Sequence, residues 1–271
     1  MTGLSRGVLV TGSSRGVGAA TALAFAQRGD RVVVHYRSAE SPARELLERL
    51  PGQGHALVRA DLADPAAVAR LAEEAAAALG RVDVLVNNAA LFLDPADARP
   101  AGGSRRGDHR ITDVDYDTWT RIWQQTLATN LLGPANLTWC VVRHMTQVDP
   151  AVGLPRGRIV NIGSRGAYRG EPDVPAYGAS KAALHAFGQS MAVALAPQGI
   201  SVVSLAPGFI ATDMAAAMLD GPQGAAIRAQ SPFGRVATPD EVAAAVVTLA
   251  DPAAEWVSGA VVDFNGASHL R

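Results

Sequence analysis

Sulfur chemistry is almost absent from this sequence, whose 271 residues include one cysteine, Cys140. A single thiol cannot form an intrachain disulfide framework or a metal site built from several thiolates. Histidine offers no substitute, since no two of the six histidines lie three or four residues apart on one helix face. We therefore expect a protein of a reducing compartment that holds no metal.

Excess charge of one sign and long hydrophobic runs are also missing. Lys and Arg together number 24 against 25 Asp and Glu, so no basic field exists to hold nucleic acid or an anionic membrane. No apolar run reaches the roughly 18 residues of a membrane span, and the chain begins without the pattern of a secretory leader. We expect a cytoplasmic protein whose partners include neither nucleic acid nor a membrane.

Lysine is the scarcest charged residue. It occurs once, at Lys181, and every other basic residue is arginine. Because a chain with this bias would carry arginine wherever any long cation suffices, position 181 is a candidate for chemistry that needs a compact ammonium rather than a planar guanidinium. The alternative is that the single lysine stands at position 181 by chance.

Apolar runs of strand length alternate with longer helical patterns along the chain. The strand patterns lie at Gly7 to Thr11, Arg31 to His35, Ala56 to Ala60, Val82 to Asn87, Arg158 to Ile162, Ser201 to Ala206 and Ala260 to Phe264. Helical patterns include Gly18 to Arg28, Pro65 to Leu79, Tyr177 to Ala196 and Asp240 to Leu249. Consecutive apolar positions are typical of strands covered on both faces. The sequence therefore predicts an α/β fold, a doubly wound parallel sheet of seven strands with helices on both faces, in a single Rossmann domain over residues 1–271.

Two stretches depart from this alternation. Residues 91–117 are dense in Pro, Gly, Asp and Arg and are long for a connection. We expect an extended arm there, either a disordered flap or a wall of the site mouth or of a subunit contact. Residues 209–234 are expected to form a substrate lid over a moderately apolar substrate, or else to pack on the core.

A glycine-rich turn, Thr11 to Gly18, follows the first strand and opens the first helix. Its three glycines let the backbone turn tightly and approach a pyrophosphate, whose charge the N–H groups at the helix start would meet. The spacing of the glycines differs from the usual dinucleotide pattern. The same residues also match G-x-S-x-G with Ser14 at its centre, the nucleophile elbow of α/β-hydrolases, but no acid and histidine partner stands out downstream.

The end of the second strand determines which dinucleotide is favoured. A carboxylate about 20 residues after the glycines would bind a ribose 2′-hydroxyl, but the residues here are His35, Tyr36, Arg37 and Ser38. Arg37 and Arg15 are instead suited to a 2′-phosphate, unless both are only solvated surface charges. The sequence therefore favours NADP(H) over NAD(H).

Tyr177 and Lys181 lie four residues apart in a helical pattern, so both side chains project from one face. A free phenol has a pKa near 10, and we expect the neighbouring ammonium to lower it, as a nicotinamide cation would. Tyr177 is then a candidate to exchange a proton with a carbonyl or alcohol oxygen.

Taken together, these residues resemble the short-chain dehydrogenases/reductases over nearly the whole chain. The motifs are Thr11 to Gly18, Asp61-Leu62, Asn87-Asn88-Ala89-Ala90, Asn130, Ser164, Tyr177, Lys181 and Pro207-Gly208. Ser164 precedes Tyr177 by 13 residues, the usual interval in this family. The run Gly208 to Met214 looks like the 3-oxoacyl-[acyl-carrier-protein] reductase branch and its relatives.

The resemblance implies roles for four catalytic residues. Tyr177 would be the general acid in reduction, and Lys181 would tune it and hold the nicotinamide ribose hydroxyls. Ser164 would hydrogen-bond the substrate oxygen, and Asn130 would hold a water that links Lys181 to solvent.

It also implies a cofactor-binding set and an assembly. Asp61 would meet the adenine, Asn88 the adenosine-side ribose, and Thr212 with the Ile210 backbone the carboxamide. The full expected set is Gly12, Ser14, Arg15, Gly16, Val17, Gly18, Arg37, Asp61, Leu62, Asn88, Tyr177, Lys181, Pro207, Gly208, Ile210 and Thr212. By analogy with the family we expect a homotetramer, or a homodimer.

The function expected from these residues is NADPH-dependent reduction of a ketone or 3-oxoacyl group, on a small-molecule or acyl-carrier-linked substrate, or the reverse oxidation. A second hypothesis is a catalytically silent NADP-binding sensor or assembly subunit with the same fold. Tight NADPH binding without turnover would favour that second hypothesis.

Overall fold

The structure is a computed structural model that describes residues 5–92 and 109–271. The remaining residues, 1–4 and 93–108, lie outside the described part of the chain, and they include most of the arm expected at 91–117.

A seven-stranded parallel sheet forms the centre of the fold, with the strand order β3-β2-β1-β4-β5-β6-β7. The strands are β1 (Gly7–Val10), β2 (Arg31–Tyr36), β3 (Ala56–Arg59), β4 (Val84–Asn87), β5 (Gly157–Ile162), β6 (Ile200–Pro207) and β7 (Val261–Phe264). All four residues of β1 and of β4 are buried, as are all residues of β5 and β6. Continuous burial follows from cover on both faces, and the predicted fold class is confirmed.

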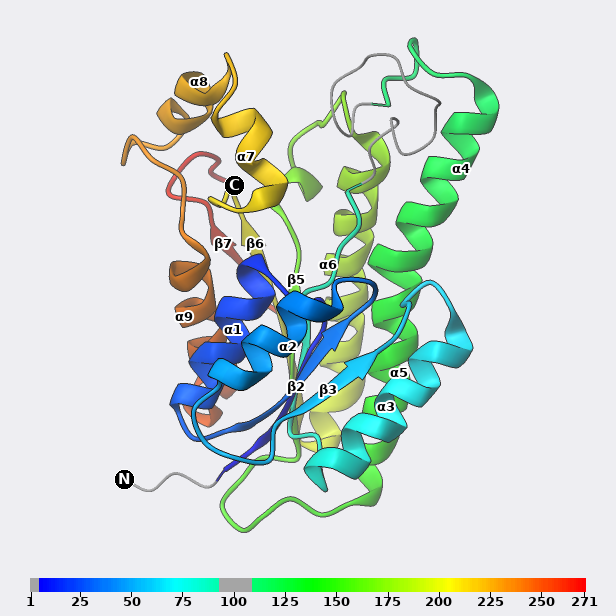
Figure 1. Ribbon diagram of the computed structural model, residues 1–271, viewed down its shortest axis with the longest axis vertical. Coiled ribbons are helices and arrows are strands. Elements are labelled where there is room, and N and C mark those ends of the chain that lie inside the picture. Colours follow the sequence, from blue (N-terminus) through cyan, green and yellow to red (C-terminus); the bar gives the residue numbers. More distant parts are fainter. Residues whose placement is uncertain (1–4, 93–108) are drawn as a thin grey trace.

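Helices cover the two faces of the sheet (Figure 1). One hydrophobic core lies between the sheet and α1 (Gly16–Gln27), α2 (Glu40–Arg49) and α9 (Pro239–Leu249). The other lies beneath α3 (Pro65–Leu79), α5 (Gly133–Gln147) and α6 (Pro175–Leu195). Neighbouring strand residues alternate between the cores: Val8 and Val10 face the first, and Leu9 faces the second.

Local sequence signals set where several helices begin. Asp64 accepts a hydrogen bond from the Ala66 N–H at the start of α3, where Pro65 occupies the first turn. At the start of α9, Thr238 and Glu241 form a reciprocal capping box. These caps satisfy N–H groups that a helix leaves unpaired at its first turn.

Beyond β4 the chain returns as α4 (Tyr116–Leu127), which continues through a π-helical turn, η2 (Ala128–Leu132), into α5. A turn of this kind is rare inside helices and is often found at functional sites. The expected lid region contains two short helices, α7 (Asp213–Leu219) and α8 (Gly224–Ala229). Ala215, Leu219 and Ile227 form a separate small apolar cluster there.

The strand order reverses at β1, which pairs with β2 on one side and β4 on the other. Ligands of open parallel sheets bind at the carboxyl ends of the strands beside such a switch point. The fold therefore directs attention to the loops after β1, β2, β4 and β5. Among the described residues, no helix is both long and apolar enough to cross a lipid bilayer.

Candidate functional site

A cleft of about 310 Å³ opens at the carboxyl ends of the strands, where the sheet order reverses. Its walls come from the loops after β1, β2, β3, β4, β5 and β6 and from α6. Every cofactor-binding residue expected from the sequence lines it, and so do Ser164, Tyr177 and Lys181. Asn130 is the one expected site residue that does not line the cleft, and it is fully buried.

The glycines of the loop after β1 allow backbone approaches that other residues would block. Gly12 has a φ of +63°, and a Cβ there would lie 2.8 Å from the Cα of Ala89. A Cβ on Gly18 would lie 2.3 Å from the Gly12 carbonyl oxygen. Both contacts are too close for a side chain, so this turn requires glycine at these two positions.

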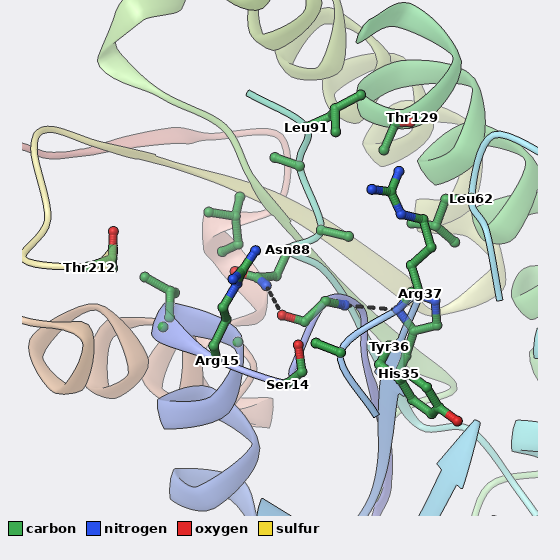
Figure 2. Close-up of a pocket in the computed structure, with 18 of the residues that line it drawn as sticks. Ser14, Arg15, His35, Tyr36, Arg37, Leu62, Asn88, Leu91, Thr129 and Thr212 are labelled. Atoms are coloured by element: carbon green, nitrogen blue, oxygen red, sulfur yellow. Dashed lines mark hydrogen bonds between the residues drawn. The ribbon is translucent and has the colours of Figure 1, made fainter. Parts of the chain in front are cut away.

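Hydrogen bonds from neighbouring strands hold the turn in place. The Asn88 side-chain amide donates to the Thr11 carbonyl at 2.8 Å. It also donates to the Gly12 carbonyl at 3.2 Å (Figure 2). His35 Nδ1 accepts from the Gly12 N–H at 2.9 Å, and its Nε2 lies 3.1 Å from the Ala60 carbonyl oxygen. Burial lowers the pKa of His35 to about 4, so the imidazole is neutral and acts as an acceptor at Gly12.

The start of α1 is open to an anion. Its N-cap residue, Arg15, provides no side-chain acceptor for the first N–H groups of the helix, and those groups lie beside the cleft lined by Gly16 and Val17. Unpaired N–H groups and the helix dipole favour a phosphate at such a position. The donor set therefore fits the pyrophosphate of a dinucleotide.

Arg15 and Arg37 both line the cleft, and their side chains lie on opposite sides of Ser14 in the view of Figure 2. Both are exposed, and within the described part of the chain neither forms an ion pair with a carboxylate. Two guanidinium groups with free donors can bind a terminal phosphate group.

At the other end of the cleft, α6 and the loop after β5 bring three polar side chains together. The Ser164 side chain lies close enough to the Tyr177 hydroxyl to lower the pKa of the phenol. Lys181 lies one helical turn further along α6, with its Nζ 5.7 Å from the centre of the Tyr177 ring. The phenol and the ammonium therefore share one pocket, as their spacing predicted.

The pKa of Tyr177 differs from the sequence-based expectation, which was that Lys181 would lower it. Burial instead raises the pKa to about 12, and the neighbouring Ser164 hydroxyl offsets only part of this effect. The loss of hydration destabilises the buried phenolate by more than its polar neighbours stabilise it. In the protein alone Tyr177 is therefore a protonated phenol at neutral pH, suited to donating a proton.

Lys181 is itself almost completely buried, with 2% of its surface exposed. Burial lowers its pKa from 10.5 to about 8. Its Nζ donates a hydrogen bond of 2.8 Å to the Ile162 carbonyl at the end of β5. The ammonium is thus held at a fixed point beneath Tyr177.

Asn130 lies in the π-helical turn η2, below the floor of the cleft. Its side chain clamps the backbone of Leu91: Oδ1 accepts from the Leu91 N–H at 2.7 Å, and Nδ2 donates to the Leu91 carbonyl at 3.0 Å. Nδ2 also lies 3.2 Å from Ser180 Oγ, on α6. Asn130 therefore joins three segments that surround the cleft.

Sequence reasoning did not single out two groups of residues that matter here. His35 supports the glycine turn through a contact across 23 residues of sequence, and no local spacing indicates it. Phe92 places its ring 5.3 Å from that of Tyr177, edge to face, and Leu91 and Thr129 also line the cleft.

The hydrolase alternative built on Ser14 finds no support in the geometry. Ser14 lines the cleft, but the nearby His35 already has both ring nitrogens occupied by Gly12 and Ala60. Across the described residues no histidine is hydrogen-bonded to Ser14. A serine nucleophile needs such a base.

Comparison with known proteins agrees with this architecture. A family model described as enoyl-(acyl carrier protein) reductase matches residues 12–269. The 3-oxoacyl-[acyl-carrier-protein] reductase FabG of Escherichia coli is 35% identical over 262 residues, covering 97% of this chain and 96% of that protein. The chain belongs to the short-chain dehydrogenase/reductase family.

Solved structures show the same fold. A short chain dehydrogenase from Burkholderia cenocepacia in complex with NADP superposes with a TM-score of 0.82 at 30% identity, over 98% of each chain. A 3-ketoacyl-(acyl-carrier-protein) reductase from Brucella melitensis, complexed with NADH, gives a TM-score of 0.82 at 27% identity, again over 98% of each chain. Members of this family thus bind nicotinamide dinucleotides of both kinds.

Proposed function

We propose that this protein is an NADPH-dependent oxidoreductase that reduces a ketone or 3-oxoacyl group to the alcohol, or catalyses the reverse reaction. The observation that carries the proposal is that Ser164, Tyr177 and Lys181 lie together in the same cleft as a glycine turn open to phosphate. The names of the 3-oxoacyl reductases among its relatives support the same reaction class.

The preference for NADPH depends on Arg15 and Arg37. Both line the cleft beside the glycine turn, and the three residues between β2 and α2, 37–39, include no carboxylate that would repel a 2′-phosphate. Asp61, after β3, is the acidic residue of the expected cofactor-binding set. Its Oδ1 accepts a hydrogen bond from the Ala63 N–H. We assign Asp61 and Leu62 to the adenine and Asn88 to the adenosine-side ribose.

Bound NADPH would supply the hydride. Tyr177, protonated up to a high pKa, donates its proton to the oxygen that gains negative charge. Ser164 donates a hydrogen bond to the same oxygen and steadies it. Lys181 holds the ribose hydroxyls of the nicotinamide side, and Asn130 supports a water through which the proton on Tyr177 is replaced.

The remaining contacts position the nicotinamide and the substrate. Thr212 and the backbone of Ile210 bind the carboxamide, beside Pro207 and Gly208. Residues 209–234, which include α7 and α8, act as a lid over a small-molecule or acyl-carrier-linked carbonyl substrate. We further propose that residues 1–271 form one domain and assemble as a cytoplasmic homotetramer.

An assay of carbonyl reduction with NADPH and NADH over a panel of ketones and 3-oxoacyl thioesters tests the proposal. We expect turnover with NADPH, and loss of turnover in Tyr177→Phe and Lys181→Arg while NADPH still binds. Full activity in Lys181→Arg would contradict the role given to the ammonium. Tight NADPH binding with no reduction of any carbonyl would instead favour a silent sensor or assembly subunit.

A further inference from the structure

The helix α6, which carries Tyr177, has no side-chain cap at its own N-terminus. Its N-cap residue is Val174, which has no side chain able to accept a hydrogen bond. Pro175, at the first helical position, has no N–H, and the N–H groups of Tyr177 and Gly178 both bond to the Val174 carbonyl. The N–H of Ala176 is thus the one donor of this first turn that needs a partner from elsewhere.

That partner is His109, which lies 67 residues earlier in the chain. Its Nε2 accepts the Ala176 N–H at 3.1 Å, and its own backbone N–H donates to the Asp173 carbonyl at 2.7 Å. The side chain is 2% exposed and lies edge to face against Trp119 of α4, with ring centres 6.2 Å apart. His109 is therefore fixed between α4 and the residue that directly precedes Tyr177.

The opposite end of the same arm touches the reacting side chain. Phe92 follows Leu91, whose backbone is clamped by Asn130, and its ring packs 5.3 Å from the ring of Tyr177. Both described ends of the stretch 91–117 thus contact the start of α6. One lies against the Tyr177 ring, and the other holds the backbone next to it.

We propose that His109 is a positioning residue: its imidazole caps the catalytic helix at Ala176 and so sets where the Tyr177 hydroxyl lies relative to Ser164. This inference depends on the proposed function for its catalytic consequence. A backbone N–H can only donate, so the role needs an acceptor at the position of Nε2. A displacement of about 1 Å at a reacting group can cost on the order of a hundredfold in rate.

The test compares two replacements of the same residue. His109→Leu keeps the bulk but removes the acceptor, whereas His109→Gln can place an amide oxygen near the position of Nε2. His55→Leu is the matched control, because His55 Nδ1 also accepts a backbone N–H, that of Val32, at 3.1 Å and far from α6. The measurements are kcat, KM, the NADPH Kd, the Tm and amide hydrogen exchange of Ala176.

We expect kcat of His109→Leu to fall about tenfold to a hundredfold, with the NADPH Kd and the carbonyl KM within about threefold of wild type. His109→Gln should recover most of kcat, and His55→Leu should lose stability without losing kcat. Equal kcat in all three variants, or equal loss in the Leu and Gln variants of His109, would overturn the proposal.

Amide exchange separates this inference from the proposed function. Ala176 should exchange faster in His109→Leu than in His109→Gln, whether or not the protein turns over any carbonyl. If the wild-type protein reduces no carbonyl but Ala176 still exchanges faster in His109→Leu, the cap is supported and the proposed reductase function is refuted. Unchanged exchange in His109→Leu refutes the cap even if the enzyme is active.

Discussion

Replacing Lys181 by methionine should make the folded protein more stable while abolishing turnover. The buried ammonium has a pKa of about 8 in place of 10.5, a difference that corresponds to about 3 kcal/mol against the folded state whenever the group is charged in both states. Methionine removes that cost. It also removes the hydrogen bond to the Ile162 carbonyl, worth about 1 kcal/mol, so the net gain at pH 7 is about 2 kcal/mol.

The pH dependence gives this prediction its sign. Below pH 8 Lys181 is protonated in both the folded and unfolded protein, and the full cost applies. Between about pH 8 and 10.5 the folded protein loses the proton first, so the stability contributed by this group rises. Above 10.5 the cost is gone. The stability advantage of Lys181→Met should therefore shrink by about 3 kcal/mol as the pH rises through this window.

Urea unfolding of wild type, Lys181→Met and Lys181→Arg at several pH values between 7 and 10.5 measures these differences. Arginine keeps its charge throughout. Because the free energy of unfolding of the wild type rises between about pH 8 and 10.5, Lys181→Arg should become less stable relative to wild type over this range. An advantage of Lys181→Met that stays constant with pH would show that the ammonium is not destabilised by burial. A gain in stability with loss of activity is the pattern expected of a residue retained for chemistry.

Three further predictions concern the cleft. Gly18→Ala should weaken NADPH binding at least tenfold by fluorescence titration, because its Cβ would fall 2.3 Å from the Gly12 carbonyl oxygen; unchanged affinity would contradict the close-packed turn. The double variant Arg15→Ala with Arg37→Ala should lose NADPH affinity by about 2 kcal/mol or more and leave NADH affinity nearly unchanged, and an equal loss for both cofactors would refute the phosphate role. For carbonyl reduction, kcat/KM should fall as the pH rises above about 8, where Lys181 loses its proton; a flat profile to pH 10 would refute a role for the ammonium.

The sheet was predictable because burial on both faces leaves a strong mark on the sequence. The predicted run Arg158 to Ile162 is β5 to within one residue, and Pro65 to Leu79 is α3 with the same bounds. The strands β2 and β5 contain runs of β-branched apolar residues, Val32 to Val34 and Ile159-Val160, and Asp64 marks the helix start. Local signals of this kind need no knowledge of distant contacts.

The sequence predicted that Tyr177 and Lys181 lie close together, but it did not predict the electrostatics around them. Helical spacing alone brings Tyr177 and Lys181 together. The spacing does not show how deeply the phenol is buried. Burial raises the pKa of Tyr177, whereas the neighbouring ammonium was expected to lower it. His35 and His109 were missed for a related reason, since each accepts a backbone N–H more than 20 residues away in sequence.

The two ends of the long arm show how a large insertion is compatible with a finely placed active site. Closing a longer loop is cheap, about 0.6 kcal/mol for each doubling of length, so length alone does little harm to stability. A loose end beside Tyr177 would be harmful, because a proton donor works only within hydrogen-bonding reach of its target. Asn130 fixes the outgoing end at Leu91, and His109 fixes the returning end at Ala176. The described ends of the arm are therefore each joined to the surroundings of Tyr177 by hydrogen bonds: one at the backbone of Leu91 and the other at the N–H that directly precedes Tyr177.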